Sequence, residues 1–324
     1  MSGAEQQILP EPVSPRPFRT VEVPGAVLAV HRPATGPGAV PTVPDPAGGR
    51  EPALFVHGLG GSAANWNALM ARLGGDLDGE AVDLPGFGES APPADGDLGL
   101  SGHVRAVTGY LEAAGRGPVH LFGNSLGGAV SVRLAALRPD LVRSLTLVSP
   151  ALPELPPQRS AWPTAMLAVP GVPALLRRLP TGAREPERAA DGLLRLVYGD
   201  PDSLGPAERA EAVAQYRRRT ELPWAAGALV GSARGIVSAY TERGEQALWR
   251  QAARVTVPVL LVYGLRDKLV SYRSARRACA AFADSRLLVL PDSRLLVLPD
   301  SGHVAMMEHP DAVARAVKEL LGLA

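Results

Sequence analysis

Two kinds of hydrophobic pattern alternate over much of this 324-residue chain. Continuous apolar runs predict strands buried on both faces, and between them apolar residues recur at helical spacing. The predicted strands are the run from Ala53, Glu80–Asp83, the run Val119–Phe122, Leu145–Val148 and Val257–Gly264. The predicted helices are Asn65–Leu73, one with Val104, Val107, Leu111 and Ala114 on one face, one from Leu126 to before Arg138, and Asp311–Leu321. Repeated strand–helix units of this kind predict an α/β protein with a mostly parallel sheet covered on both faces.

The N-terminal region follows a different pattern. Residues 1–17 contain four prolines and little apolar periodicity, so we expect a disordered or surface-lying leader. Phe18–Val23 and Ala26–His31 flank Pro24-Gly25 and predict a hairpin. Arg32–Arg50 is rich in Pro, Gly and Ala and predicts a long loop.

The strand–helix alternation stops at Ser149-Pro150 and resumes near residue 254. Residues 151–253 contain helical segments broken by Pro and Gly and no convincing strand. We therefore predict a core of residues 18–150 plus 254–324 and a helical cap insertion of residues 151–253. Five arginines of this insertion, Arg177, Arg178 and Arg217 to Arg219, are expected on solvated helix faces, with a clamp for an anionic substrate as the alternative.

A tandem duplication interrupts the C-terminal part of the chain. The eight residues D-S-R-L-L-V-L-P occur at Asp284–Pro291 and again at Asp292–Pro299. This period is far too short for a solenoid or propeller, so only one copy is needed for a sheet strand. We expect the second copy, Arg294–Leu298, to form the strand because it leads directly into S-G-H.

Composition excludes several classes of protein. A net charge of +1 gives no basic field for nucleic acid, and the single Cys279 excludes an intrachain disulfide framework and cysteine-based zinc sites. Cys279 is expected to be a buried thiol on a helix. The start of the chain has no secretory signal pattern, and no apolar run is long enough to span a bilayer. We therefore expect a cytoplasmic protein, while the sequence assigns no oligomeric state.

The segment G-N-S-L-G, Gly123–Gly127, places one serine between a predicted strand and a predicted helix. Such a strand–turn–helix projects the hydroxyl of Ser125 from the carboxyl end of the strand, and the flanking glycines relieve crowding in the turn. A serine hydroxyl is a weak nucleophile that needs a base, and the base needs a carboxylate to fix its tautomer.

His303 is the best candidate for the base because it follows a predicted strand in the polar loop D-S-G-H-V. Three other histidines are expected to be structural: His31 in the hairpin, His103 on a helix and His120 in the serine strand. His57 is expected to belong to the architecture of its loop, and His309 opens the last helix beside Pro310. For the carboxylate we predict Asp267, in the loop after Val257–Gly264. Asp292 and Asp300 are rivals within the duplicated region, and Asp300 is the more typical turn former.

Stabilisation of an oxyanion requires two backbone N–H groups. We expect the N–H of Leu126 to be one of these groups, because Leu126 follows the serine at the start of a helix. The other is expected from the loop H-G-L-G-G, at Leu59 with Gly60 as the second choice. The loop lacks the G-K-[S/T] ending of a phosphate-binding loop, which disfavours nucleotide binding.

Taken together, these segments resemble capped α/β-hydrolase-fold enzymes of the lipase/esterase, C–C-bond hydrolase and haloperoxidase-like group. The matching segments are Val56–Trp66, Asp83–Ser90, Gly123–Gly128, Tyr263–Asp267 and Ser301–Pro310, in the family's order. The resemblance implies Ser125 as nucleophile, Asp267 as acid, His303 as base, and a cap inserted after the sixth strand. A serine at the turn disfavours the dehalogenase and epoxide-hydrolase branches, which use aspartate there.

The resulting hypothesis is a serine hydrolase that needs no cofactor or metal and acts on a small, hydrophobic ester or acyl compound. A C–C-bond hydrolase of ring-fission products is the alternative within the family, since Asn124 before the serine resembles that branch, although the G-P-G of its glycine loop is missing. A binding or regulatory protein with little turnover is the alternative outside it. The extra copy lies between Asp267 and His303, so it would affect how His303 is positioned and not which histidine is the base.

Overall fold

A computed structural model describes residues 18–32, 49–154, 158–169, 171, 186–284 and 293–323. The leader of residues 1–17, most of the predicted loop 32–50 and most of the first duplicated copy lie outside these ranges, as do Arg177, Arg178 and Asp292.

One eight-stranded sheet organises the chain, in the order β1-β2-β4-β3-β5-β6-β7-β8. Its strands are β1 Phe18–Val23, β2 Ala26–His31, β3 Glu51–Val56, β4 Leu77–Val82, β5 Val119–Asn124, β6 Val142–Val148, β7 Val259–Gly264 and β8 Ser293–Leu298. The β1–β2 hairpin joins β4 antiparallel, and β4 through β8 are parallel. This confirms the predicted α/β-hydrolase fold with a mostly parallel sheet.

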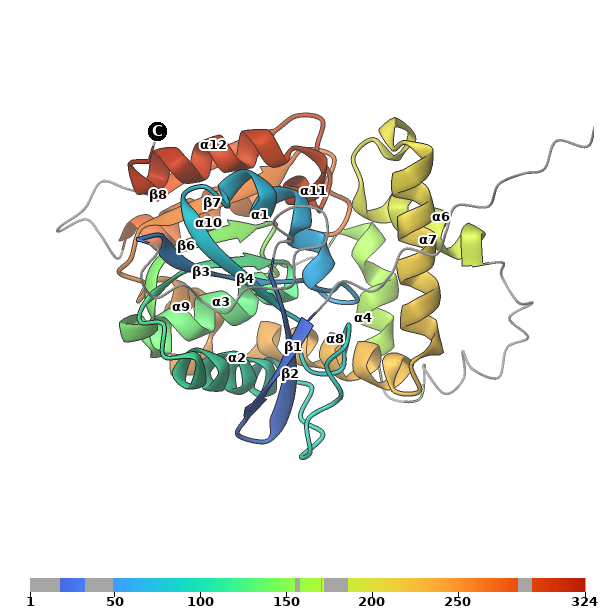
Figure 1. Ribbon diagram of the computed structural model, residues 1–324, viewed down its shortest axis with the longest axis horizontal. Coiled ribbons are helices and arrows are strands. Elements are labelled where there is room, and N and C mark those ends of the chain that lie inside the picture. Colours follow the sequence, from blue (N-terminus) through green and yellow to red (C-terminus); the bar gives the residue numbers. More distant parts are fainter. Residues whose placement is uncertain are drawn as a thin grey trace, which may run out of the picture.

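Two layers of helices cover the sheet (Figure 1). One layer contains α2 Leu100–Ala114, α3 Leu126–Leu137, α9 Leu248–Ala252 and α10 Arg273–Asp284; the other contains α1 Asn67–Leu73, α11 Ala305–Glu308 and α12 Pro310–Leu321. Strand side chains alternate between the two layers: Leu54 and Leu121 enter the first cluster, whereas Phe55 and Phe122 enter the second. Both faces of the central strands are therefore buried, which explains their continuous apolar runs.

The remaining helices follow β6: α4 Trp162–Ala168, α6 Pro186–Val197, α7 Pro206–Glu221 and α8 Ala225–Thr241. The first three lie to the right of the sheet in Figure 1, and α8 runs below it and contacts α2. Short 3-10 turns are η1 Ala63–Trp66, η2 Pro139–Leu141, η3 Arg159–Ala161, η4 Pro201–Ser203 and η5 Gly244–Gln246. The described part of residues 151–253 contains no strand, as predicted. Its last helix, α9, packs against α3 and α10 beside the sheet.

The observed bounds differ from the prediction for two elements and agree with it for a third. The strand expected at Glu80–Asp83 begins earlier, as β4 Leu77–Val82. The helix expected from Asn65 divides into η1 and α1. The second copy of the duplication forms β8, which pairs in parallel with β7 from Ser293 to Leu298, as expected.

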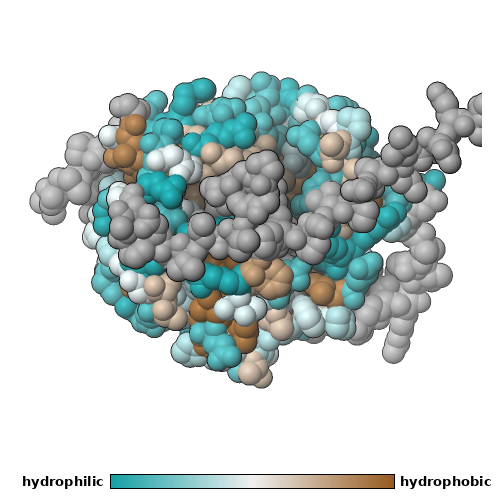
Figure 2. Space-filling model, viewed as in Figure 1, coloured by the Kyte–Doolittle hydropathy of each residue, from teal (hydrophilic) through white to brown (hydrophobic). Residues whose placement is uncertain are grey.

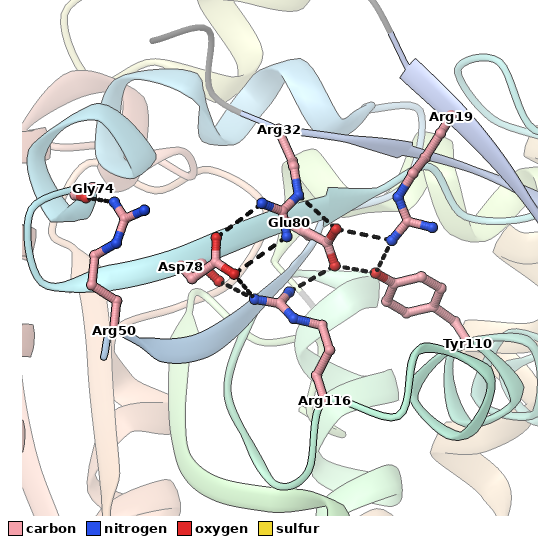
Figure 3. A network of polar contacts seen from close by, with 8 residues as sticks. All are labelled: Arg19, Arg32, Arg50, Gly74, Asp78, Glu80, Tyr110 and Arg116. Atoms are coloured by element: carbon pink, nitrogen blue, oxygen red, sulfur yellow. Dashed lines mark hydrogen bonds and ion pairs between the residues drawn. The ribbon is translucent and has the colours of Figure 1, made fainter. Parts of the chain in front are cut away.

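β4 pairs with β3 from Leu77, and its Asp78 and Glu80 lie in a network of polar contacts (Figure 3). The fully buried Glu80 accepts hydrogen bonds from Arg19 and Arg32 at 2.9 and 2.8 Å and from Arg116 at 2.7 Å, and it also pairs with Tyr110. Arg32 and Arg116 reach Asp78 as well. These contacts join β1, β2 and α2 to β4.

The exposed surface matches a protein whose apolar residues are mostly inside. On the face in Figure 2 hydrophilic residues predominate, and hydrophobic residues form small groups, one of them low in the view. Val27 of the β1–β2 hairpin is one exposed hydrophobic residue. No helix among the described residues is long and apolar enough to cross a membrane.

Candidate active site

Ser125 occupies the sharp turn between β5 and α3, with φ 52° and ψ −114°. A serine rarely adopts a positive φ, and such strain persists only where the surroundings impose it. A Cβ on Gly123 would lie 2.5 Å from the carbonyl oxygen of Gly127, and one on Gly127 would lie 2.3 Å from that of Val56. Both positions therefore require glycine, as the sequence pattern predicted. Without side chains there, the backbone can turn sharply enough to keep the serine at the end of the strand.

Asp267 and His303 form a buried pair at the same edge of the sheet. Asp267 Oδ2 lies 2.9 Å from His303 Nδ1, while Oδ1 accepts hydrogen bonds from the N–H groups of Leu269 at 2.8 Å and Val270 at 3.0 Å. Burial raises the pKa of the Asp267 carboxyl, but attraction to His303 and these hydrogen bonds outweigh it and leave the pKa lowered. The carboxylate is therefore ionised and fixed in orientation at neutral pH.

Asn124 connects the serine turn to the histidine loop. Its side-chain amide donates to the backbone oxygens of Val148 at 3.0 Å and His303 at 3.1 Å. No hydrogen bond joins Ser125 Oγ to His303 among the described residues, and such catalytic hydrogen bonds are often long before substrate binds. In the sequence Asn124 is distinctive only through its resemblance to C–C hydrolases, because its bridging role depends on a contact 179 residues away.

The glycine loop passes directly beside Ser125. A Cβ on Gly58 would lie 3.0 Å from Ser125 Cβ, so the next residue, Leu59, lies close to the serine. Neither the Leu59 N–H nor the Leu126 N–H at the start of α3 donates to another residue in the part of the chain described. An oxyanion hole needs N–H groups without another acceptor, and in the described residues both predicted groups meet that requirement.

His57 holds this glycine loop in place. Its Nδ1 lies 2.7 Å from the carbonyl oxygen of Gly58, and its Nε2 lies 2.9 Å from the N–H of Leu84, from which it accepts. Burial lowers the pKa of His57, so the ring is neutral with Nδ1 as the donor. His57 is thus structural, as expected.

The other histidines also lie in the elements predicted for them. His31 pairs with Asp83, His103 with Ser232 and His120 with both Ser144 and Glu51, and His309 precedes α12. Of the two alternatives to Asp267, only Asp300 lies in the described residues; it is exposed and pairs with Arg266 at 3.1 Å. Asp267 is therefore the carboxylate that the structure brings to His303.

One arginine of residues 151–253 does not follow its prediction. Arg217 and Arg218 form ion pairs with Glu187 and Glu211. Arg219, expected on a solvated face, is instead partly buried, and its Nη1 donates to the carbonyl oxygen of Gly60 at 2.6 Å. The prediction was wrong because helical spacing does not reveal which face of α7 meets the glycine loop.

Two other kinds of reactive group are a free thiol and a cluster of metal ligands. Cys279 lies on α10 and is half-buried rather than fully buried, and burial raises the pKa of its thiol. The residues described in the structure contain no group of three or more His, Cys, Asp or Glu side chains that could hold a metal ion.

Comparisons with known proteins identify relatives over most of the chain. The alpha/beta hydrolase fold family matches residues 52–310. The 2-(acetamidomethylene)succinate hydrolase of Mesorhizobium japonicum is 30% identical over 241 residues, 74% of this chain and 79% of that protein. An esterase of Mycobacterium tuberculosis is 39% identical over 102 residues, 31% of this chain and 34% of the esterase.

Other relatives match over shorter parts of their length. The matches to acetyltransferase components of the acetoin cleaving systems of Cupriavidus necator and Pseudomonas putida are 38% and 43% identical, cover 32% of this chain, and span only 27% and 28% of those proteins. Among solved structures, a putative lipase from Acinetobacter baumannii superposes with a TM-score of 0.71 at 18% identity, covering 95% of this chain and 91% of the lipase. At this identity the similarity concerns the fold alone.

Three findings point to one family: the match to the family model, the relative aligned over three quarters of the chain, and the order of strands in the sheet. The chain belongs to the alpha/beta hydrolase fold family.

Proposed function

We propose that this protein is a serine hydrolase of a carboxylic ester, with Ser125 as nucleophile, His303 as base and Asp267 as acid. The observation that supports it most is the buried Asp267–His303 pair, 2.9 Å apart, tied through Asn124 to the strained Ser125 turn. Esterases and lipases among the relatives support ester hydrolysis.

The reaction follows from the hydrogen-bond roles at this site. Asp267 Oδ2 accepts from the Nδ1–H of His303, which leaves the Nε2 lone pair free to take the proton from Ser125. The Ser125 oxygen then bonds to the ester carbonyl carbon, and the N–H groups of Leu59 and Leu126 stabilise the oxyanion. His303 gives its proton to the departing alcohol, and water hydrolyses the acyl-enzyme by the same two steps.

In this proposal the described helices α4, α6, α7 and α8 cap the site and enclose a small hydrophobic ester or acyl compound, whereas α9, the last helix of the predicted insertion 151–253, belongs to the layer on the sheet. Buried Leu194 and Tyr198 of this segment join the same apolar cluster as Met306 beside the histidine loop, which supports a cap packed against the site.

The test is turnover of p-nitrophenyl esters by the wild type and by Ser125→Ala. The variant should lose activity to near the uncatalysed rate, because both the nucleophile and the acyl-enzyme are lost. Retained activity in Ser125→Ala would refute the assignment of the nucleophile.

A second candidate is hydrolysis of a substrate that carries a carboxylate, including C–C cleavage of a ring-fission product. It is favoured by Arg219, whose guanidinium reaches the glycine loop and has no carboxylate partner in the described residues. Two relatives are named for substrates that carry a carboxylate: the 2-(acetamidomethylene)succinate hydrolase above and a 2-hydroxymuconate semialdehyde hydrolase. The burial that lowers the pKa of Arg219 also makes an anionic partner favourable.

A matched substrate panel separates the two candidates: p-nitrophenyl butyrate, the hemisuccinate of p-nitrophenol, and a ring-fission dienoate. If Arg219 binds a carboxylate, the wild type prefers an anionic substrate and Arg219→Gln loses that preference, whereas Arg217→Gln keeps it. An equal loss on neutral and anionic esters in Arg219→Gln would contradict carboxylate binding.

A further inference from the structure

The C-terminal end of cap helix α6 lies against the loop that carries His303. The His303 N–H donates to the carbonyl oxygen of Val197 at 2.7 Å. Two residues further along the cap, the Gly199 N–H donates to Oε2 of Glu308 at 2.7 Å. The backbone of the predicted base is thus hydrogen-bonded to the cap rather than only to the core.

Glycines allow these two backbones to touch. A Cβ on Gly199 would lie 2.3 Å from the carbonyl oxygen of Asp300, and one on Gly302 would lie 2.5 Å from both the nitrogen of Gly199 and the oxygen of Val197. No side chain fits at either position without separating the segments. The position of the cap end and that of the histidine loop are therefore mutually dependent.

Glu308 uses both carboxylate oxygens at this junction. Oε1 accepts from the N–H of Gly302 at 2.8 Å and the hydroxyl of Ser301 at 3.2 Å, and Oε2 accepts from Gly199 as above. Within the described residues no Lys or Arg forms an ion pair with Glu308, so its charge is directed to these donors. Hydrogen bonds to an ionised acceptor are roughly twice as strong as neutral ones.

The same end of α6 also contacts the loop of Asp267. Lys268, the next residue after Asp267, donates through Nζ to the carbonyl oxygen of Arg195 at 2.5 Å. The last turn of one cap helix thus accepts hydrogen bonds from His303 itself and from Lys268, the residue next to Asp267.

We propose that Glu308 is a positioning residue that couples the seating of the cap to the position of His303. The proposal rests on the proposed function, in which His303 is the base. With the α6 end seated, the turn at Ser301-Gly302 is held by Glu308 and the His303 N–H is bonded to Val197. Displacing that end removes both restraints from the base together.

The first variant is Glu308→Gln, in which one carboxylate oxygen is replaced by an NH₂ group that cannot accept from a backbone N–H. Because misplacing a catalytic group by about 1 Å can cost about 100-fold in rate, we expect kcat to fall about 10- to 100-fold with KM changed less than about threefold. The exposed Glu221→Gln on α7 is the matched control and should keep wild-type kinetics. Gly199→Ala displaces the junction from the cap side, leaves every group of the histidine loop intact, and should reproduce the loss.

Amide hydrogen exchange measures the coupling without any substrate. In Glu308→Gln and Gly199→Ala, exchange should accelerate in peptides spanning both 195–201 and 299–306, and remain unchanged in α3. Unchanged exchange at 299–306 in both variants overturns the proposal, as does faster exchange with wild-type kcat. Should Glu308→Gln fail to fold, Gly199→Ala decides.

A failure of the proposed function looks different from a failure of the coupling. If the wild type hydrolyses none of the esters and Ser125 resists acylation, the assignment of His303 as base fails. Exchange in the two variants then still decides whether cap and histidine loop are coupled.

Discussion

Replacing Asp267 with Asn separates the role of its charge from that of its shape. Oδ1 of Asp267 accepts two backbone hydrogen bonds, from Leu269 and Val270, so the amide oxygen of an asparagine should take that position. The NH₂ group then faces His303 Nδ1 and donates to it. The histidine is forced into the tautomer with its proton on Nε2, which cannot accept a proton from Ser125.

The expected loss follows from the loss of the general base. Asp267 is 7% exposed and His303 4% exposed, so the pair is buried and the orientation of the ring depends on the carboxylate. General-base catalysis contributes about 100- to 10,000-fold to a rate, so kcat/KM should fall by about that factor. The two backbone hydrogen bonds are kept, so the loss of activity should exceed any loss of fold.

The assay is kcat/KM for a p-nitrophenyl ester at neutral pH, with the thermal midpoint measured on the same samples. Asp300→Asn is the matched control, because Asp300 is a nearby aspartate paired only at the surface, and it should retain activity within about twofold. Wild-type activity in Asp267→Asn, or an equal loss in Asp300→Asn, would refute the assignment of the acid.

Three further predictions concern stability and the duplication. Burial opposes ionisation of Glu80, but the arginines and Tyr110 lower its pKa from 4.5 to about 2 in the folded protein, so it stabilises the fold above pH 4.5 by about 3 kcal/mol and this is lost as pH falls toward 2. In urea unfolding, Glu80→Gln should have a lower free energy of unfolding than the wild type at pH 7, and that free energy should fall less between pH 4.5 and 2. The same pH dependence in the variant and the wild type would contradict this. Gly127→Ala should lose several kcal/mol of stability or fail to fold, because its Cβ would meet the Val56 carbonyl oxygen at 2.3 Å; near-wild-type denaturation would exclude that contact. Deleting Asp284–Pro291 should keep or improve ester hydrolysis, because β8 uses the second copy, and an inactive folded deletion would show that the first copy is required.

The parts predicted correctly are those whose chemistry is local in the sequence. The turn at Ser125 needs small residues on either side within five positions, so a short motif suffices to recognise it. Asp267 and His303 each come directly after a strand, and parallel strands end at the same edge of a sheet, so their proximity follows from chain order. The two copies of the duplicated strand are identical, and only the S-G-H segment after the second copy distinguishes them.

The parts missed depend on contacts between distant segments. Asp78 and Gly79 are weak strand formers, so the beginning of β4 was not recognised. Arg32 and Arg116 pair with Asp78, and the ring of Phe55 packs where a side chain of Gly79 would be. Tertiary contacts thus override local propensity there.

Arg219 and Glu308 were missed for a related reason. Arg219 reaches Gly60 across 159 positions, and Glu308 reaches Gly199 across 109. Helical periodicity identifies a polar face but not the surface it meets. Glu308 lay inside a recognised motif, S-G-H-V-A-M-M-E-H-P, but the motif does not name its partners.

Activation of Ser125 by His303 can be measured directly by labelling with a fluorophosphonate, followed by intact mass and peptide mapping. We expect one adduct per chain, located on Ser125, lost in Ser125→Ala and formed much more slowly in His303→Ala. An adduct on another residue, or no adduct on a folded wild-type protein, would contradict it.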